Sequence, residues 1–149
     1  MRRRTDFIVV HCSATPPDSD IGADEINDWH ESRGWNGIGY HAVIRRDGQI
    51  EFGRHFDAIG AHVKGHNARS VGVCLVGGVD EDGKAEDNFT PDQGESLMNL
   101  LGMLRCAYPG AEVLGHRDLS PDLNGDGVID SHEWVKDCPS FDVREHLAL

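Results

Sequence analysis

The sequence predicts a single-domain α/β protein in which helices flank a central mixed β-sheet. Strand-like and helix-like runs alternate along the chain, which is typical of a sheet covered by helices. A length of 149 residues suffices for one core and is too short for two ordinary domains. We therefore expect one domain over residues 1–149, with no internal repeat.

The first two elements are a strand and a helix. The β-branched run at 7–12 predicts a central strand that delivers His11 at its carboxyl end. A surface helix is expected at 23–33, where Ile26, Trp29 and Arg33 recur at helical spacing and Gly34 follows as the stop.

A hairpin and a further strand follow. Two strand-like runs at 40–46 and 49–53 enclose Asp47-Gly48, which is the strongest hairpin signal in the chain. The apolar run at 71–76 predicts another buried strand because it is short, continuous and rich in valine.

The last two elements are a capped helix and a short strand. Thr90 supplies a capping residue, Pro91 the first helical position and Gln93 the third, and a leucine stripe then runs until Pro109-Gly110 ends the helix. A strand at 112–114 leads directly to a glycine and a histidine.

Composition excludes several classes of function. The chain has 26 acidic and 14 basic residues, a net charge of −12 and a pI near 5.0, which argues against a nucleic-acid partner. No stretch approaches the ~20 apolar residues of a membrane span. The apolar run at 7–10 is too short for a secretion signal after Arg2–Arg4, so we expect synthesis in the cytoplasm and a separate route of release.

Histidines and cysteines are the candidate metal ligands. In a reducing compartment the four cysteines are expected as free thiols or ligands rather than disulfides. Catalytic zinc takes three protein ligands and keeps one open position. Spacing alone does not select three ligands from the nine histidines and four cysteines. The candidates are His11, His41, His55, His62, His66, His116 and Cys138.

Ordered sequence blocks select among these candidates. They are VVHCSAT at 9–15, GW at 34–35 with GYH at 39–41, RDG at 46–48, GAHVKG at 60–65, VGVCLVGG at 71–78, NFTP at 88–91 and KDCPSFD at 136–142. Through these blocks the chain resembles, over residues 7–143, the zinc-dependent N-acetylmuramoyl-L-alanine amidases of type 2.

The resemblance implies a role for individual residues. It assigns zinc binding to His11, His116 and Cys138, and work at the scissile amide to Tyr40 and Lys136. His62 would line the substrate groove, and Trp35 would either lie against a sugar ring or pack within the fold. The other cysteines, Cys12, Cys74 and Cys106, are expected to be structural.

The resemblance also implies an activity. A monomeric endolysin of this family cleaves bacterial peptidoglycan between N-acetylmuramic acid and L-alanine, and it reaches the wall after release from the cell. One alternative is a cytosolic amidase that recycles small muropeptides. A second is a binding module without activity, which the three filled ligand positions disfavour. A third is contact with a phage RNA polymerase, which a relative in this family restrains.

An insertion before Cys138 matches an EF-hand-like calcium loop at 122–133. Oxygen ligands stand at loop positions 1, 3, 5 and 9, glycine at position 6 and glutamate at position 12, and position 7 would offer its carbonyl. Because the loop ends three residues before Lys136, we expect bound Ca²⁺ to order the segment that carries Lys136 and Cys138. The predicted ligands are Asp122, Asn124, Asp126, Val128, Asp130 and Glu133.

Overall fold

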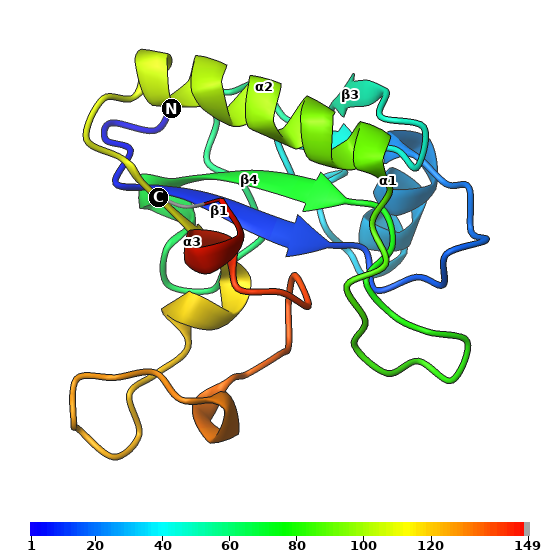
Figure 1. Ribbon diagram of the computed structural model, residues 1–149. Helices are drawn as coiled ribbons and strands as arrows, with labels where there is room; N and C mark the ends of the chain where they lie inside the picture. Colours follow the sequence, from blue (N-terminus) through cyan, green and yellow to red (C-terminus); the bar gives the residue numbers. More distant parts are fainter. Residues whose placement is uncertain (148–149) are drawn as a thin grey trace.

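The computed structural model describes residues 1–147 and contains a five-stranded mixed sheet (Figure 1). The strands are β1 (Phe7–Cys12), β2 (Ala42–Ile44), β3 (Ile50–Phe52), β4 (Ser70–Leu75) and β5 (Glu112–Gly115). Their order is β3-β2-β4-β1-β5, in which only β3 is antiparallel to its neighbour. The predicted α/β class with a mixed central sheet is therefore confirmed.

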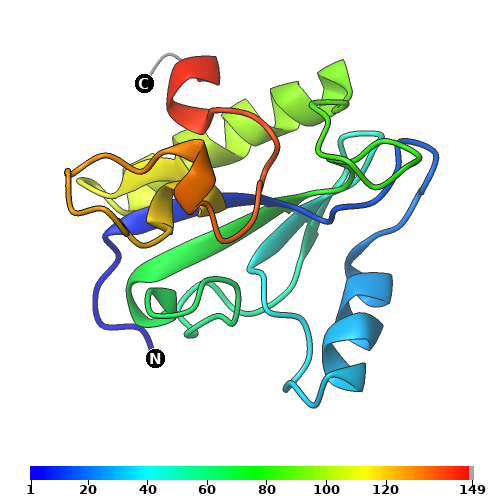
Figure 2. The same ribbon diagram turned by 90° about the horizontal axis from the view of Figure 1, so that it is seen from below.

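Within residues 1–147 three α-helices and three short 3-10 helices surround this sheet (Figure 2). They are α1 (Ala23–Ser32), η1 (Asn67–Arg69), α2 (Pro91–Ala107), η2 (His116–Leu119), η3 (Ser131–Glu133) and α3 (Val143–His146). α2 begins at the predicted cap, where Thr90 Oγ1 accepts a hydrogen bond from the backbone N–H of Gln93 at 3.1 Å. None of the helices in this part of the chain combines the length and the apolar character of a membrane span.

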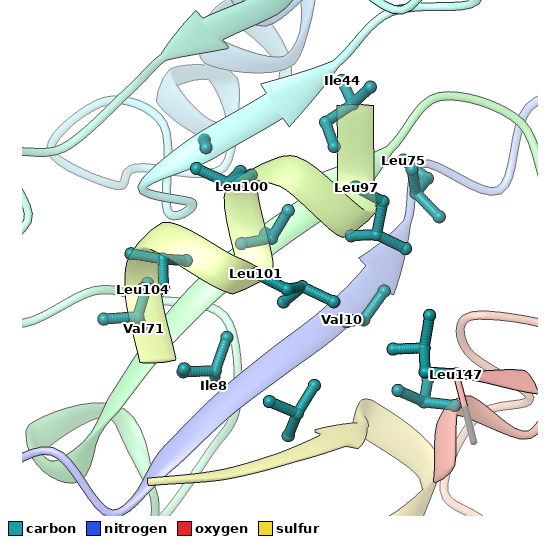
Figure 3. Close-up of a cluster of buried hydrophobic side chains, with 14 residues drawn as sticks. Ile8, Val10, Ile44, Val71, Leu75, Leu97, Leu100, Leu101, Leu104 and Leu147 are labelled. Atoms are coloured by element: carbon teal, nitrogen blue, oxygen red, sulfur yellow. The ribbon is translucent and has the colours of Figure 1, made fainter. Parts of the chain in front are cut away.

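The main core lies between α2, α3 and one face of the sheet (Figure 3). The predicted leucine stripe of α2 points into this core from positions 97, 100, 101 and 104. Alternate residues of the central strands meet it, because successive side chains of a strand face opposite sides of the sheet. Burial of each such leucine contributes roughly 1.5–3 kcal/mol.

The opposite face of the sheet carries a smaller apolar cluster and the polar residues of the site. Ile26 of α1 packs there with Val43, Cys74 and Val76. The side of α1 that faces the sheet carries Ile26 and His30, one helical turn apart, whereas Trp29 is 41% exposed. The shared spacing of Ile26, Trp29 and Arg33 therefore does not mark the buried side of this helix.

Candidate metal centre and active site

Two neighbouring parallel strands bring the two histidines together. Val10 of β1 pairs with Gly115 of β5, so His11 and His116 follow at the same edge of the sheet. The third group, Cys138, lies in the loop that leads to α3. One ligand atom from each of these three residues lies within 4.8 Å of the others, although 127 positions separate the first from the last.

Backbone contacts hold the sulfur in place. The backbone N–H of Cys12 donates to Cys138 Sγ at 3.3 Å, and the Cys138 carbonyl accepts from the N–H of Arg117 at 2.9 Å. A Cβ at Gly115 would lie only 2.9 Å from the Pro139 ring, so glycine is needed where the loop approaches the strand end. The loop is thereby fastened to β1, which carries His11, and to η2, which begins at His116.

The three residues suit zinc in chemistry and in spacing. His11 Nδ1 lies 3.8 Å from Cys138 Sγ. Zinc bonds of about 2.3 Å to sulfur and 2.0–2.1 Å to nitrogen, at a tetrahedral angle, separate these two atoms by roughly 3.6 Å. Burial lowers the pKa of His11 well below its usual value, so the ring is neutral and able to ligate. Burial, and after it the positive charge of Lys136, lowers the pKa of His116 to about 4.

A cavity of about 140 Å³ opens onto His11 and His116. The four residues predicted for catalysis and substrate contact, Lys136, Tyr40, His62 and Trp35, all line it. The full set of lining residues is His11, His30, Arg33, Trp35, Tyr40, Ala61, His62, His116 and Lys136. The structure therefore places the predicted catalytic and substrate residues around one space.

Tyr40 stands between the metal ligands and α1. Its ring centroid lies 5.0 Å from that of His11 and 5.6 Å from that of His30. Burial raises the pKa of Tyr40 well above its usual value of 10.0, so the phenol stays protonated and offers a hydrogen-bond donor. Trp35 is 39% exposed and packs on His30 with 4.5 Å between ring centroids, which leaves part of its ring open to the cavity.

Both ring nitrogens of His62 are already occupied by protein partners. Its Nδ1 lies 2.8 Å from His11 Nε2, and its Nε2 lies 3.2 Å from Ser70 Oγ. Contact between His62 and a substrate in the cavity would therefore involve its ring carbons rather than its nitrogens.

The remaining histidine candidates lie outside the trio. His41 accepts the backbone N–H of Gly72 at Nδ1 and contacts the Ala58 carbonyl with Nε2, so both nitrogens are used. The side chain of His55 is 80% exposed. His66 lines a second hollow of about 400 Å³, which shares His116 with the site and is bounded by Lys64 and Val135.

Sequence reasoning missed three contributions to the site. His30 and Arg33 line the cavity, and Cys12 supplies its backbone N–H to Cys138. The helical spacing of Ile26 and His30 could have indicated the first of these. The contact of Cys12 depends on a loop more than a hundred residues away, for which no local signal exists.

The segment at 122–133 forms a loop that projects away from the sheet, drawn in orange in Figure 1. The Asp122 carboxylate accepts the backbone N–H groups of Gly125 and Gly127, each at 2.8 Å. Gly127 has φ = +84°, a conformation that suits glycine. The Glu133 carboxylate is buried and accepts N–H groups from both halves of the loop, those of Leu123, Asn124 and Asp130.

The fold and the trio together define a class of protein. A neutral His, His and Cys set that is buried on one side and open to a cavity on the other is typical of a catalytic zinc site, in which three protein ligands leave one position free. The chain is thus built as a metal-dependent hydrolase.

Comparison with known proteins specifies this class further. Residues 1–140 match the family described as N-acetylmuramoyl-L-alanine amidase, and the chain belongs to this family of zinc-dependent peptidoglycan hydrolases. The endolysin of Klebsiella phage KP32 is 48% identical over 143 residues, which are 96% of this chain and 85% of the relative. The endolysin of Escherichia phage T7 is 46% identical with the same coverage.

Solved structures agree with the sequence relatives. The amidase LysC from Clostridium intestinale superposes with a TM-score of 0.75 at 28% identity, covering 98% of this chain and 87% of LysC. The resemblance drawn from the sequence blocks is confirmed, as is the activity of an N-acetylmuramoyl-L-alanine amidase.

Proposed function

We propose that this chain acts as an endolysin that cleaves the amide between the lactyl group of N-acetylmuramic acid and L-alanine, with zinc on His11, His116 and Cys138. One observation carries the proposal. The three ligand atoms lie within 4.8 Å of one another beside a cavity that Lys136 and Tyr40 also line.

The ligand set determines what the neighbouring residues must do. Zinc held there supplies a water nucleophile at neutral pH by lowering the pKa of that water towards ~7. The thiolate of Cys138 reduces the net charge of the site and hence its pull on the substrate carbonyl. Lys136 makes up for this loss, because its ammonium group can donate to the oxygen that becomes negative during attack on the amide.

Tyr40 has a complementary role at the same amide. Its phenol is protonated, since burial raises its pKa, and its ring packs beside that of His11. The hydroxyl therefore orients the attacking water or the substrate carbonyl by donating a hydrogen bond.

The rim of the cavity fits a substrate with a sugar and a peptide. Trp35 offers an aromatic face for a sugar ring, and Arg33 adds a positive charge at the same cavity. The walls formed by Ala61 and the ring carbons of His62 are apolar. The scissile amide would thus lie against the metal ligands, with the muramic acid towards Trp35.

Product analysis on intact cell walls tests the proposal. Purified protein that contains about one equivalent of zinc is incubated with sacculi, and new amino termini and new reducing sugar ends are measured separately. We expect new L-alanine amino termini and no reducing ends. New reducing ends, or amino termini from another residue, would overturn it. Preference for anhydro-muropeptides over sacculi would instead favour the recycling enzyme.

We further propose that the loop at 122–133 binds Ca²⁺ and thereby steadies the metal centre. Support comes from the sequence pattern, from glycine at position 6 with positive φ, and from the carboxylates of Asp130 and Glu133, whose oxygens lie within 4.8 Å of one another.

Contacts after the loop link it to the zinc site. The backbone N–H of Val135 donates to Ser120 Oγ at 3.1 Å, Arg117 stacks on Trp134 with 4.1 Å to the ring centroid, and Arg117 also pairs with Asp137 at 3.2 Å. These contacts hold the segment that carries Lys136 and Cys138. Ca²⁺ would strengthen them by relieving the repulsion among the loop carboxylates.

A further inference from the structure

The two ring nitrogens of His11 face different partners. Nδ1 lies 3.8 Å from Cys138 Sγ, on the side of the metal ligands, whereas Nε2 lies 2.8 Å from Nδ1 of His62. A neutral imidazole carries one N–H and one lone pair. The His11 ring ligates through Nδ1 only when its proton is on Nε2, so the position of one proton decides whether the ring can bind a metal.

A fixed acceptor at the end of a hydrogen-bond chain determines that position. The Ser70 hydroxyl donates to the carbonyl oxygen of His66 at 2.8 Å, because a carbonyl can only accept. Ser70 Oγ must then accept from His62, whose Nε2 lies 3.2 Å away. The opposite direction would leave the two oxygens of Ser70 and His66 in contact without a proton between them.

The remaining proton positions in this hydrogen-bond chain follow because a neutral imidazole carries a single proton. His62 is only 9% exposed, and burial favours the uncharged ring with a single proton, which the contact with Ser70 Oγ places on Nε2. Its Nδ1 is then an acceptor. His11 must donate to it from Nε2, which leaves the lone pair of His11 Nδ1 directed at Cys138 Sγ and His116.

The surrounding fold is built to hold the His62 ring in this chain. A Cβ at Gly72 would lie 2.6 Å from the ring carbon Cγ of His62, and one at Gly60 would lie 2.7 Å from Cδ2, so the ring occupies the space that two glycines leave. Asn67 Oδ1 accepts the backbone N–H groups of His62 and Val63 at 2.8 and 2.9 Å. Ser70 is fully buried and His11 is 1% exposed, so water has little access to replace either of them as a hydrogen-bond partner of His62.

We propose that His62 and Ser70 are positioning residues that fix His11 as the Nε2–H tautomer and so prepare its Nδ1 for zinc. The proposal rests on the proposed zinc site and adds to it a chain of hydrogen bonds that ends at the carbonyl of His66. Partners of this kind typically change metal affinity by about 10–100-fold when they are removed.

The first test is direct observation of the tautomers of His11 and His62. Long-range ¹H–¹⁵N correlation spectra of zinc-free, ¹⁵N-labelled protein at neutral pH distinguish the two neutral forms of each ring. We expect the Nε2–H form for both His11 and His62, and a shift of the His62 pattern in Ser70→Ala. An Nδ1–H form of His62, or an even mixture of forms at His11, would overturn the proposal whatever the enzyme does to cell walls.

Zinc affinity gives the second test. Competition with a chromogenic chelator should show weakening of about tenfold for Ser70→Ala and a larger loss for His62→Ala. His62→Asn should recover part of it, because the Asn side-chain oxygen can accept near the place of Nδ1. Ser96→Ala, which removes a hydroxyl that bonds Gly48 from α2, is the matched control and should bind zinc as the wild type does.

The two tests separate this proposal from the function itself. Circular dichroism and thermal unfolding establish that each variant is folded before its zinc affinity is compared. If Ser70→Ala and His62→Ala keep wild-type zinc affinity while the wild type still releases L-alanine termini from sacculi, the positioning role of His62 and Ser70 is wrong and the amidase assignment stands. If the tautomers are as expected and sacculi remain intact, the amidase assignment fails alone.

Discussion

The backbone N–H of Cys12 lies 3.3 Å from the Sγ of Cys138 and donates to it, across 126 positions of sequence. The strand that presents His11 thus also orients the sulfur, because Cys12 is the next residue of β1. In the metal-free protein the hydrogen bond with the Cys12 thiol and burial raise the pKa of Cys138, and this backbone donor acts in the opposite direction, towards the thiolate that a metal requires. The β1 end therefore positions two of the three ligands, one through a side chain and one through the main chain.

Removal of this sulfur should abolish metal binding. In Cys138→Ala the site keeps two imidazoles, which are too few to hold a catalytic zinc tightly. We expect the zinc content to fall from about one equivalent to near zero and amidase activity to disappear. Cys106→Ala, at an exposed cysteine of α2, is the control and should retain both. A Cys138→Ala protein that still holds one equivalent of zinc would contradict the assigned ligands.

Loss of the cavity lysine should affect turnover rather than metal content. Lys136→Met keeps most of the side-chain volume and removes the charge that we assign to the developing oxyanion. We expect kcat to fall about 10²–10³-fold, with zinc content unchanged by elemental analysis. The matched change Lys84→Met, in the exposed loop at 80–87, should leave kcat unchanged. Equal kcat in both variants would exclude the oxyanion role.

Loss of the Tyr40 hydroxyl should lower kcat by less than loss of the Lys136 charge. Tyr40→Phe keeps the ring beside His11 and removes one hydrogen-bond donor. Because hydrogen bonds to charged groups are worth about 1.5–3 kcal/mol, kcat should fall roughly 10–100-fold while zinc affinity is preserved. The measurement is steady-state hydrolysis of a soluble muramoyl peptide. Tyr108→Phe changes the other tyrosine of the chain, outside the cavity, and should have wild-type kcat.

Local patterns predicted the five strands, α1 and α2 with small errors at their ends, whereas the four-residue helix α3 was not predicted. β1 and the hairpin turn at Asp47-Gly48 were predicted because a β-branched run and a two-residue turn carry their own signals. Gln93 illustrates what such signals omit. It was predicted as the third residue of a capped helix, and it also donates from Nε2 to the carbonyls of Ile44, the last residue of β2, and Val76, which follows β4.

The site residues were predictable only through the resemblance to the family. The assignment of His11, His116 and Cys138 came from resemblance, because their spacing along the chain carries no ligand pattern. Their convergence depends on the parallel pairing of β1 with β5 and on a loop contact, neither of which is local. The roles of Ser70 and of the Cys12 backbone were not predictable for the same reason, since both depend on partners brought together by the sheet.

Calcium should stabilise the zinc-loaded protein. At a concentration of 100 Kd, a ligand bound to the native state alone adds about 2.7 kcal/mol to the free energy of unfolding, which corresponds to a rise in Tm of roughly 5–10 °C for a chain of this size. We expect this rise with Ca²⁺, together with slower loss of zinc to a competing chelator. Asp126→Ala should remove both effects, and Asp82→Ala, in the other acidic loop, should keep them. Unchanged melting and zinc loss in millimolar Ca²⁺ would contradict the calcium proposal.

Acid should destabilise the metal-free protein through its buried histidines. The contribution of one of them, His41, can be measured separately. Burial lowers the pKa of His41 to about 4, whereas the unfolded ring titrates near 6.5. Between these values the unfolded chain binds a proton that the native chain does not. The contribution of His41 to the free energy of unfolding is therefore complete above pH 6.5 and falls by roughly 3 kcal/mol as the pH drops to about 4.

Urea titrations at several pH values measure this dependence. His41→Gln will be less stable than the wild type at neutral pH, because it loses the hydrogen bonds to Gly72 and Ala58 and the stacking on Phe56. Its stability should nevertheless decline less steeply between pH 6.5 and 4.5. His55→Gln, at an exposed ring, should keep the wild-type slope. Parallel slopes for all three proteins would mean that the native state protonates His41 as readily as the unfolded chain does.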